Sequence, residues 1–139
     1  MSYWSLNKAG CGLATEKAPP PAEEMAFGQS LRAVIRRLDQ VTLVALCGSA
    51  GMSEARDLRG KLESLADEEA PVIVLDLQGL DFIGSPGLAA IIFCHLKECR
   101  HHGQVRLVAP QPAVLEVFER IRLTELFPVY ASVEEAMTL

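Results

Sequence analysis

The feature that most constrains this chain is the regular alternation of strand-like and helix-like segments from Leu31 onward. β-rich runs occur at 31–38, 41–47, 72–77, 105–109 and 127–131, and segments with helical spacing of apolar residues follow each run after the first. Strands that alternate with helices of this length need right-handed crossovers and a largely parallel sheet. The sequence therefore predicts one α/β domain in the order ββαβαβαβα. We expect a mixed, mostly parallel sheet with an antiparallel edge strand, and helices packed on the sheet.

The N-terminal segment differs from the rest of the chain. Residues before about Gly28 show no sustained period and include the run Pro19-Pro20-Pro21, which cannot join a helix interior or a central strand. A chain of 139 residues is long enough for a single core. We therefore expect a flexible N-terminal tail over residues 1–28 and one folded domain over residues 29–139.

Composition excludes several classes of protein. The formal net charge of −5 argues against nucleic-acid binding, and Arg32, Arg36 and Arg37 are expected on the solvated face of an edge strand. No apolar run approaches the roughly 18–20 residues that span a bilayer, so membrane insertion is not expected. The four cysteines form no CxxC pair, and no secretory signal precedes them. A cytoplasmic protein with reduced thiols is predicted.

Several helix ends are predicted from local capping residues. Ser53 and Ser85 are expected as N-caps, because a serine oxygen accepts a hydrogen bond from the first turn. Ser132 and Glu135 have the spacing of a capping box, which predicts a closing helix. Gly103 is expected to adopt the left-handed conformation that ends the second long helix.

The stretch DFIGSPGL, residues 81–88, follows a buried strand directly. Sites in α/β sheets tend to lie at the carboxyl ends of strands, and this position carries the hydroxyl of Ser85. A purely structural interpretation accounts for Ser85 as a cap and for Pro86 as the next residue. It does not account for Gly87, which costs a helix interior about 0.5–1 kcal/mol relative to alanine. Both interpretations of Ser85, structural and functional, remain open at this point.

Catalytic, metal and cofactor sites receive little support. His95, Cys99 and His102 share one helix face, but a fourth metal ligand is not evident. The pattern around Ser85 is not G-x-S-x-G, and no activating base can be assigned to it. The glycine-rich turns at 48–51 and 84–87 lack the lysine of a P-loop. We predict a non-enzyme without metal or cofactor, and a small-ligand or nucleotide-binding domain is the least favoured alternative.

Three segments resemble one known family. VIVLDLQGLDFIGSPGLAAII, residues 72–92, resembles the signature of the STAS domain, with Asp76-Leu77, Phe82-Ile83, Ser85 and Gly87-Leu88 in register. VLEVFERIRLTELFPVYASVEEAM resembles the third helix, last strand and closing helix of that domain. VTLVALCGSAGM resembles the strand that normally ends in G-E-L-D. The resemblance covers Leu31 to Leu139.

The resemblance implies an anti-sigma factor antagonist, a non-catalytic regulator that docks an anti-sigma factor. In such antagonists the partner is a serine kinase of GHKL type, and the serine matching Ser85 is its phosphorylation site. The implied partner-binding residues are Gly48, Ser49, Gly51, Met52, Gly84, Ser85, Pro86, Gly87 and Leu88. Two family acids are replaced here, by Gly84 and by Gly51. An alternative therefore stays open, a non-phosphorylated STAS scaffold in a sensory or transport-linked complex, and so does a weak homodimer.

Overall fold

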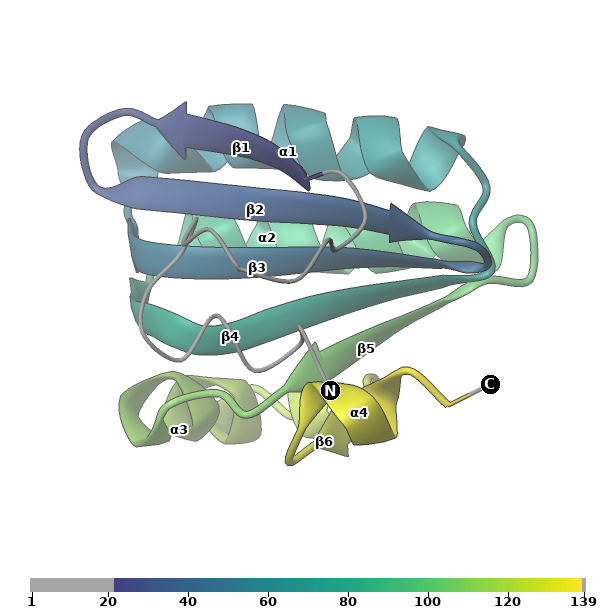
Figure 1. Ribbon diagram of the computed structural model, residues 1–139. Coiled ribbons are helices and arrows are strands. Elements are labelled where there is room, and N and C mark those ends of the chain that lie inside the picture. The colour runs from purple at the N-terminus through teal and green to yellow at the C-terminus, as the bar shows by residue number, and fades with distance from the viewer. Residues whose placement is uncertain (1–21, 139) are drawn as a thin grey trace.

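The computed structural model describes residues 22–138, which form one sheet with helices on both of its faces (Figure 1). The strands, in their order across the sheet, are β1 (Ala22–Phe27), β2 (Leu31–Leu38), β3 (Val41–Ala50), β4 (Val72–Ile83), β5 (Gln104–Val108) and β6 (Val129–Tyr130). The α-helices are α1 (Met52–Asp67), α2 (Ser85–Cys99), α3 (Pro112–Arg120) and α4 (Val133–Ala136), and a 3-10 turn spans Leu123–Glu125. The predicted α/β class and the order of its elements are confirmed.

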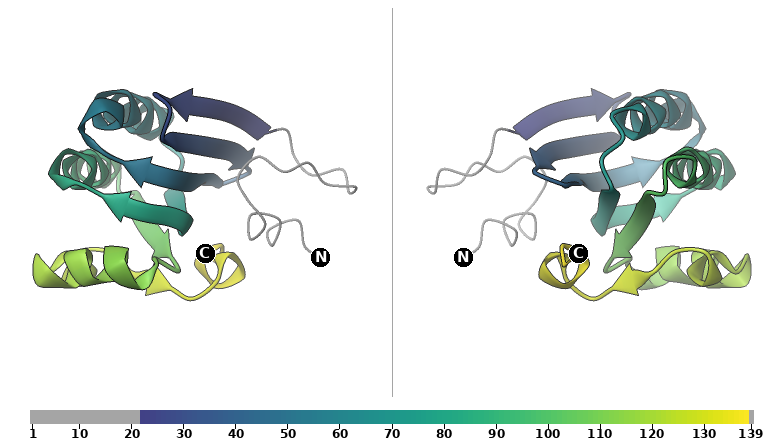
Figure 2. Two further views of the ribbon diagram at one scale, coloured as in Figure 1. Left: turned by 90° about the vertical axis from the view of Figure 1, so that its left-hand side faces the viewer. Right: turned by 90° about the vertical axis from the view of Figure 1, so that its right-hand side faces the viewer.

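The sheet is antiparallel at one edge and parallel elsewhere. β1 pairs antiparallel with β2 and β2 with β3, whereas β3, β4, β5 and β6 run parallel to one another. The parallel strands follow chain order, so right-handed crossovers place their connecting helices on a single face. Figure 2 shows α1 and α2 side by side on this face and α4 on the other. The carboxyl ends of β3 and β4 therefore lie beside the N-termini of α1 and α2.

β4 supplies side chains to both layers of the core. Ile73, Leu75 and Leu77 are fully buried in the large cluster beneath α1, α2 and α3. Val72 and Val74 belong to a smaller cluster that includes side chains of α4. The continuous apolar run of this strand is explained by its coverage on both faces.

The antiparallel edge of the sheet contains a strand that sequence patterns did not predict. Residues 22–27, assigned above to the tail, form β1, so the predicted start of the domain at residue 29 is too late. β2 is consequently an interior strand, and the expectation that its arginines lie on a solvated edge is wrong for Arg36, which is only 5% exposed. The rest of the predicted tail, residues 1–21, lies outside the described residues.

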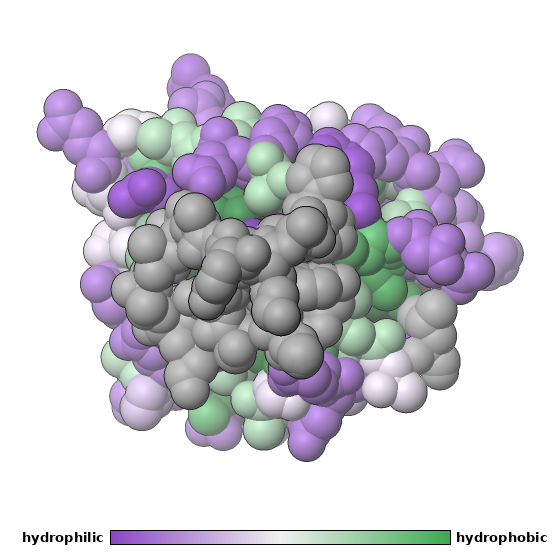
Figure 3. Space-filling view, viewed as in Figure 1, coloured by the Kyte–Doolittle hydropathy of each residue, from purple (hydrophilic) through white to green (hydrophobic). Residues whose placement is uncertain are grey.

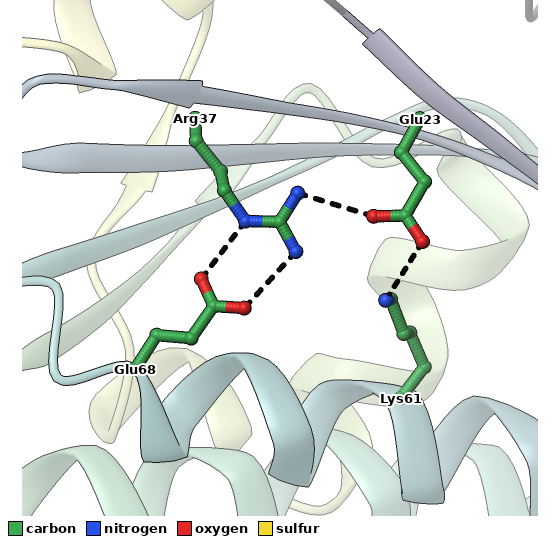
Figure 4. A network of polar contacts seen from close by, with 4 residues as sticks. All are labelled: Glu23, Arg37, Lys61 and Glu68. Atoms are coloured by element: carbon green, nitrogen blue, oxygen red, sulfur yellow. Dashed lines mark hydrogen bonds and ion pairs between the residues drawn. The ribbon is translucent and has the colours of Figure 1, made fainter.

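A network of ion pairs ties β1 and β2 to α1 (Figure 4). Arg37 donates two hydrogen bonds to the carboxylate of Glu68, at 2.9 and 3.0 Å, and one to Glu23 at 3.1 Å. Lys61 binds the other oxygen of Glu23 at 2.9 Å. The hydrogen bonds from Lys61 and Arg37 hold the pKa of Glu23 below its ordinary value. The network fastens the edge of the sheet to the helix layer.

The surface drawn in Figure 3 is hydrophilic along its upper rim, over β1 and α1. Within residues 22–138, no helix combines the length and the hydropathy that crossing a membrane would require.

Candidate partner-binding site

Two loops meet at the carboxyl ends of the central parallel strands. The first joins β3 to α1 and the second joins β4 to α2, and the left panel of Figure 2 looks onto this end of the sheet. Ala50 pairs with Ile83 across the two strands, and the amide of Gly84 donates a 2.9 Å hydrogen bond to the carbonyl of Ala50. The structure thus brings the predicted segments 48–52 and 84–88 together, at the N-termini of two long helices.

Ser85 is the first residue of α2 and not its N-cap. Gly84 occupies the cap position in an extended conformation, with φ −92° and ψ 177°, and its carbonyl accepts the amide of Leu88 at 3.0 Å. The prediction that Ser85 caps the helix is therefore wrong. The Ser85 side chain is exposed, and its hydroxyl makes no hydrogen bond with any residue in the described part of the chain. The hydroxyl is free for modification or for contact with a partner.

Gly87 has a packing role that the sequence left unexplained. A Cβ atom at this position would lie 2.8 Å from Cγ1 of Ile83 and 3.4 Å from Cβ of Ala50. Only glycine lets the first turn of α2 approach β3 and β4 so closely. The close approach packs the first turn of α2, which begins with Ser85, against the last residues of β3 and β4.

The residues expected to bind a partner differ in exposure. Met52 is 81% exposed, and Ser85 and Pro86 are also exposed. Gly48, Ser49, Gly51 and Gly84 are partly exposed. Gly87 and Leu88 are buried, and their roles are to pack α2 against the sheet. The accessible part of the predicted surface is therefore centred on Met52, Ser85 and Pro86.

The loop between β3 and α1 is held from several directions. Gly48 has φ +108°, and a Cβ there would overlap the carbonyl oxygen of Ser30. The next residue, Ser49, donates its amide to that same carbonyl at 2.8 Å. Its hydroxyl donates to Oδ1 of Asp81 at 2.7 Å. Asp81 is an acidic residue of this end of the sheet that sequence reasoning passed over.

α1 begins earlier than predicted. Gly51, not Ser53, is its N-cap, and the carboxylate of Glu54 accepts hydrogen bonds from the Gly51 amide at 3.2 Å and the Ser53 hydroxyl at 3.1 Å. Glu54 is nearly buried, at 6% exposure. Its negative charge thus serves the first turn of α1 and is not presented to solvent.

Helix dipoles and a carboxylate make opposite contributions to the electrostatics of this end of the sheet. The positive ends of the α1 and α2 dipoles, from helices of 16 and 15 residues, point to the same edge. Burial, together with the nearby Asp81 carboxylate, raises the pKa of the Cys47 thiol, so this cysteine stays protonated at neutral pH. The site offers a free hydroxyl and helix amides, without an activated nucleophile at Cys47.

The histidine and cysteine residues of α2 have a structural arrangement. His95 is 9% exposed, and its ring packs edge-on against Phe127 with centroids 4.8 Å apart. Burial lowers the pKa of His95. Cys99 Sγ lies 3.5 Å from His95 Nε2, whereas His102 is in the following turn with φ +68°. In residues 22–138, no group of three or more His, Cys, Asp or Glu side chains could hold a metal ion.

Comparisons with known proteins agree on one family. A family model of the STAS domain matches residues 32–136. A putative anti-sigma factor antagonist, BtrV of Bordetella bronchiseptica, is 29% identical over 106 residues, which cover 76% of this chain and 91% of that protein. A putative anti-anti-sigma factor of Mycobacterium tuberculosis, Rv2638, is 35% identical over 77 residues, 54% of this chain and 51% of that protein. The crystal structure of an anti-sigma factor antagonist from Mycobacterium paratuberculosis is similar with a TM-score of 0.71 and 26% identity, over 78% of this chain and 92% of that chain.

Proposed function

This chain belongs to the STAS domain family. We propose that it is an anti-sigma factor antagonist and that phosphorylation of Ser85 switches its binding to a partner. Relatives that match most of the chain carry the name of anti-sigma factor antagonist, which supports a regulatory, protein-binding role over catalysis. The partner is an anti-sigma factor that is also a serine kinase of GHKL type. Such an antagonist acts in the cytoplasm, where transcription takes place.

The observation that carries this proposal is the free hydroxyl of Ser85 at the start of α2. A phosphate adds about −1.5 to −2 charges at neutral pH. At this position the charge meets the first-turn amides and the positive end of the helix dipole, so the domain itself tolerates it. A partner seated over Met52, Ser85 and Pro86 would have to desolvate the phosphate. A loss of only about 1.4 kcal/mol in binding changes the affinity tenfold.

A second candidate function rests on the missing acids. A Cβ at Gly84 would have only ordinary contacts, the nearest at 3.7 Å, and the backbone there is extended. An acidic side chain would therefore fit, and packing does not explain its replacement by glycine. A kinase that recognises those carboxylates would find neither at Gly84 nor at Gly51. This favours, as the alternative, a STAS scaffold that binds its partner without being phosphorylated.

The test is a binding titration between this protein and its cognate anti-sigma factor kinase. We expect Ser85→Asp to weaken binding at least tenfold, while Ser64→Asp, which adds the same charge to an exposed position in the last turn of α1, leaves binding unchanged. Ser85→Ala should keep both binding and stability to within about 0.5 kcal/mol, because Ser85 is not a helix cap.

Incubation with the kinase and ATP, followed by mass spectrometry, separates the two candidates. Phosphate on Ser85 supports the switched antagonist. A stable complex without that phosphate leaves the scaffold as the function, and equal affinities of the Ser85→Asp and Ser64→Asp variants would contradict a switch at Ser85.

A further inference from the structure

A hollow on the helix layer continues from the Ser85 loop along the line where α1 and α2 pack together. We call it the α1–α2 groove, and it is lined by Met52, Ala55, Arg56, Arg59, Pro86 and Ala89. Met52 and Pro86 belong both to this groove and to the predicted partner-binding residues. A protein seated over Ser85 would therefore reach the groove without a gap.

An exposed apolar stripe on α2 borders the groove and continues beyond its lining residues. Pro86, Ala89, Phe93 and Leu96 recur at intervals of three and four residues, so they form one stripe along α2. Phe93 is 38% exposed and Leu96 is 49% exposed, and Met52 at the head of α1 is 81% exposed. Large apolar side chains grouped in this way on a folded domain mark a surface that a partner covers.

The charged side chains of the groove are all positive. The Arg59 guanidinium lies 4.0 Å from the centroid of the Phe93 ring and also binds Glu63 at 2.8 Å. Arg56 makes no hydrogen bond or ion pair with any residue that the structure describes. No Asp or Glu is among the six lining residues, although the chain as a whole carries a net charge of −5. The groove is thus a basic, apolar strip on an acidic protein.

We propose that the α1–α2 groove binds an acidic amphipathic segment of the protein partner. An apolar side chain of that segment lies between Met52, Pro86 and Ala89, and its carboxylates pair with Arg56 and Arg59. A carboxylate at Arg56 gains an ion pair without breaking one, because this guanidinium has no partner among the described residues. The inference rests on the proposed function only in taking the partner to be the protein that covers Ser85.

The first experiment uses the cognate anti-sigma factor kinase and a charge reversal. Arg56→Glu should weaken binding at least tenfold, and the loss should shrink at high salt. Arg120→Glu is the matched control, since it makes the same charge change at an exposed position on α3 and should leave the affinity unchanged. Unchanged binding by Arg56→Glu, beside an effect of Ser85→Asp, would overturn the groove and leave the proposed function standing.

The second experiment tests the groove without the kinase. Amide chemical shifts are followed by NMR while the protein is titrated with a helical peptide of alternating Leu and Glu pairs, or with the same peptide carrying Lys for Glu. We expect the acidic peptide alone to shift amides of residues 52–59 and 87–96, and Arg56→Glu to abolish the shifts.

Such shifts would support binding of an acidic segment in the groove even if no anti-sigma factor bound the protein. The groove proposal and the proposed function can therefore be contradicted independently. Equal shifts from both peptides, or shifts elsewhere, would overturn the proposal. So would concentration-dependent dimerisation in sedimentation that Arg56→Glu removes, because a second copy would then be the occupant.

Discussion

The buried carboxylate of Glu98 should make the stability of this domain fall as pH rises. Glu98 lies on α2 with no exposed surface, and its Oε1 is 2.7 Å from Nε2 of His101. Burial raises the pKa of this carboxyl from its ordinary value of 4.5 to about 7, and the nearby His101 only partly opposes the shift. Such a group favours its protonated form in the folded protein.

The sign and size of the effect follow from proton linkage. Between pH 4.5 and about 7 the folded state binds more protons at Glu98 than the unfolded state does, so the free energy of unfolding decreases with pH. A shift from 4.5 to about 7 corresponds to about 3 kcal/mol, which is present in acid and lost once the pH passes the folded pKa. Glu98→Gln keeps the shape of the side chain and removes its ionisation. The free energy of unfolding of this variant, relative to the unmodified protein, should therefore rise by about 2–3 kcal/mol from pH 5 to pH 8, because part of the effect is already lost at pH 5.

Urea unfolding at pH 5, 6, 7 and 8 measures this difference. Glu116→Gln is the control, because that carboxylate on α3 is largely exposed and should give a profile parallel to the unmodified protein. Parallel pH profiles for Glu98→Gln and the unmodified protein would refute the reasoning, since Glu98 would then ionise alike in the folded and unfolded chains.

Two further predictions concern the sheet edge and the glycines. Arg37→Ala should reduce the free energy of unfolding by about 1 kcal/mol, and by less in 1 M salt, because Arg37 and its two partners in Figure 4, Glu23 and Glu68, are each near 40% exposed. Urea unfolding at two salt concentrations tests this, and a salt-independent loss would contradict it. Gly48→Ala and Gly60→Ala should change stability in opposite directions. Gly48→Ala should lower the free energy of unfolding by at least about 2 kcal/mol, because Gly48 has a φ of +108° and a Cβ there would overlap Ser30. Gly60→Ala should raise the free energy of unfolding by about 0.5–1 kcal/mol, because a Cβ there meets no atom within 4 Å in the helix. Thermal unfolding of both variants measures these changes. Changes in stability of the same sign would count against the conformation assigned to Gly48.

The apolar framework was predictable because its signals are local and periodic. The continuous apolar run of β4 predicts a strand buried on both faces, and the helical stripe of α1 predicts one buried face; both are as the structure has them. β1 was not predictable in this way. Its sequence AEEMAF is rich in Ala and Glu, which are depleted in strands, and it becomes a strand only through antiparallel pairing with β2. That pairing is a long-range property that no local pattern contains.

The helix ends show the same limit at smaller scale. Serine is a favoured N-cap in isolation, yet both long helices begin after glycines, Gly51 and Gly84. The amide of Gly84, the residue after the end of β4, donates to the carbonyl of Ala50, and α2 starts at the following residue, Ser85. At the other end of α2 the left-handed residue is His102 and not Gly103. Tertiary hydrogen bonds override the capping preference of the side chain, whereas Ser132, free of such a constraint, caps α4 as predicted.

The two glycines at the cap positions also alter what a phosphate would do to this domain. With carboxylates at positions 84 and 51, a phosphorylated Ser85 would add a like charge to the same end of the sheet, and part of its cost would fall on the domain. Here the carboxylate of Asp81 is already engaged by the Ser49 hydroxyl, and that of Glu54 is buried against the first turn of α1. The hydrogen bond from Ser49 leaves Asp81 charged, so this carboxylate still opposes a phosphate, but positions 84 and 51 add no further negative charge. On the proposal that Ser85 is phosphorylated, the missing acids would lower the cost of the phosphate to the domain itself. The same absence would weaken recognition by a kinase that reads those carboxylates.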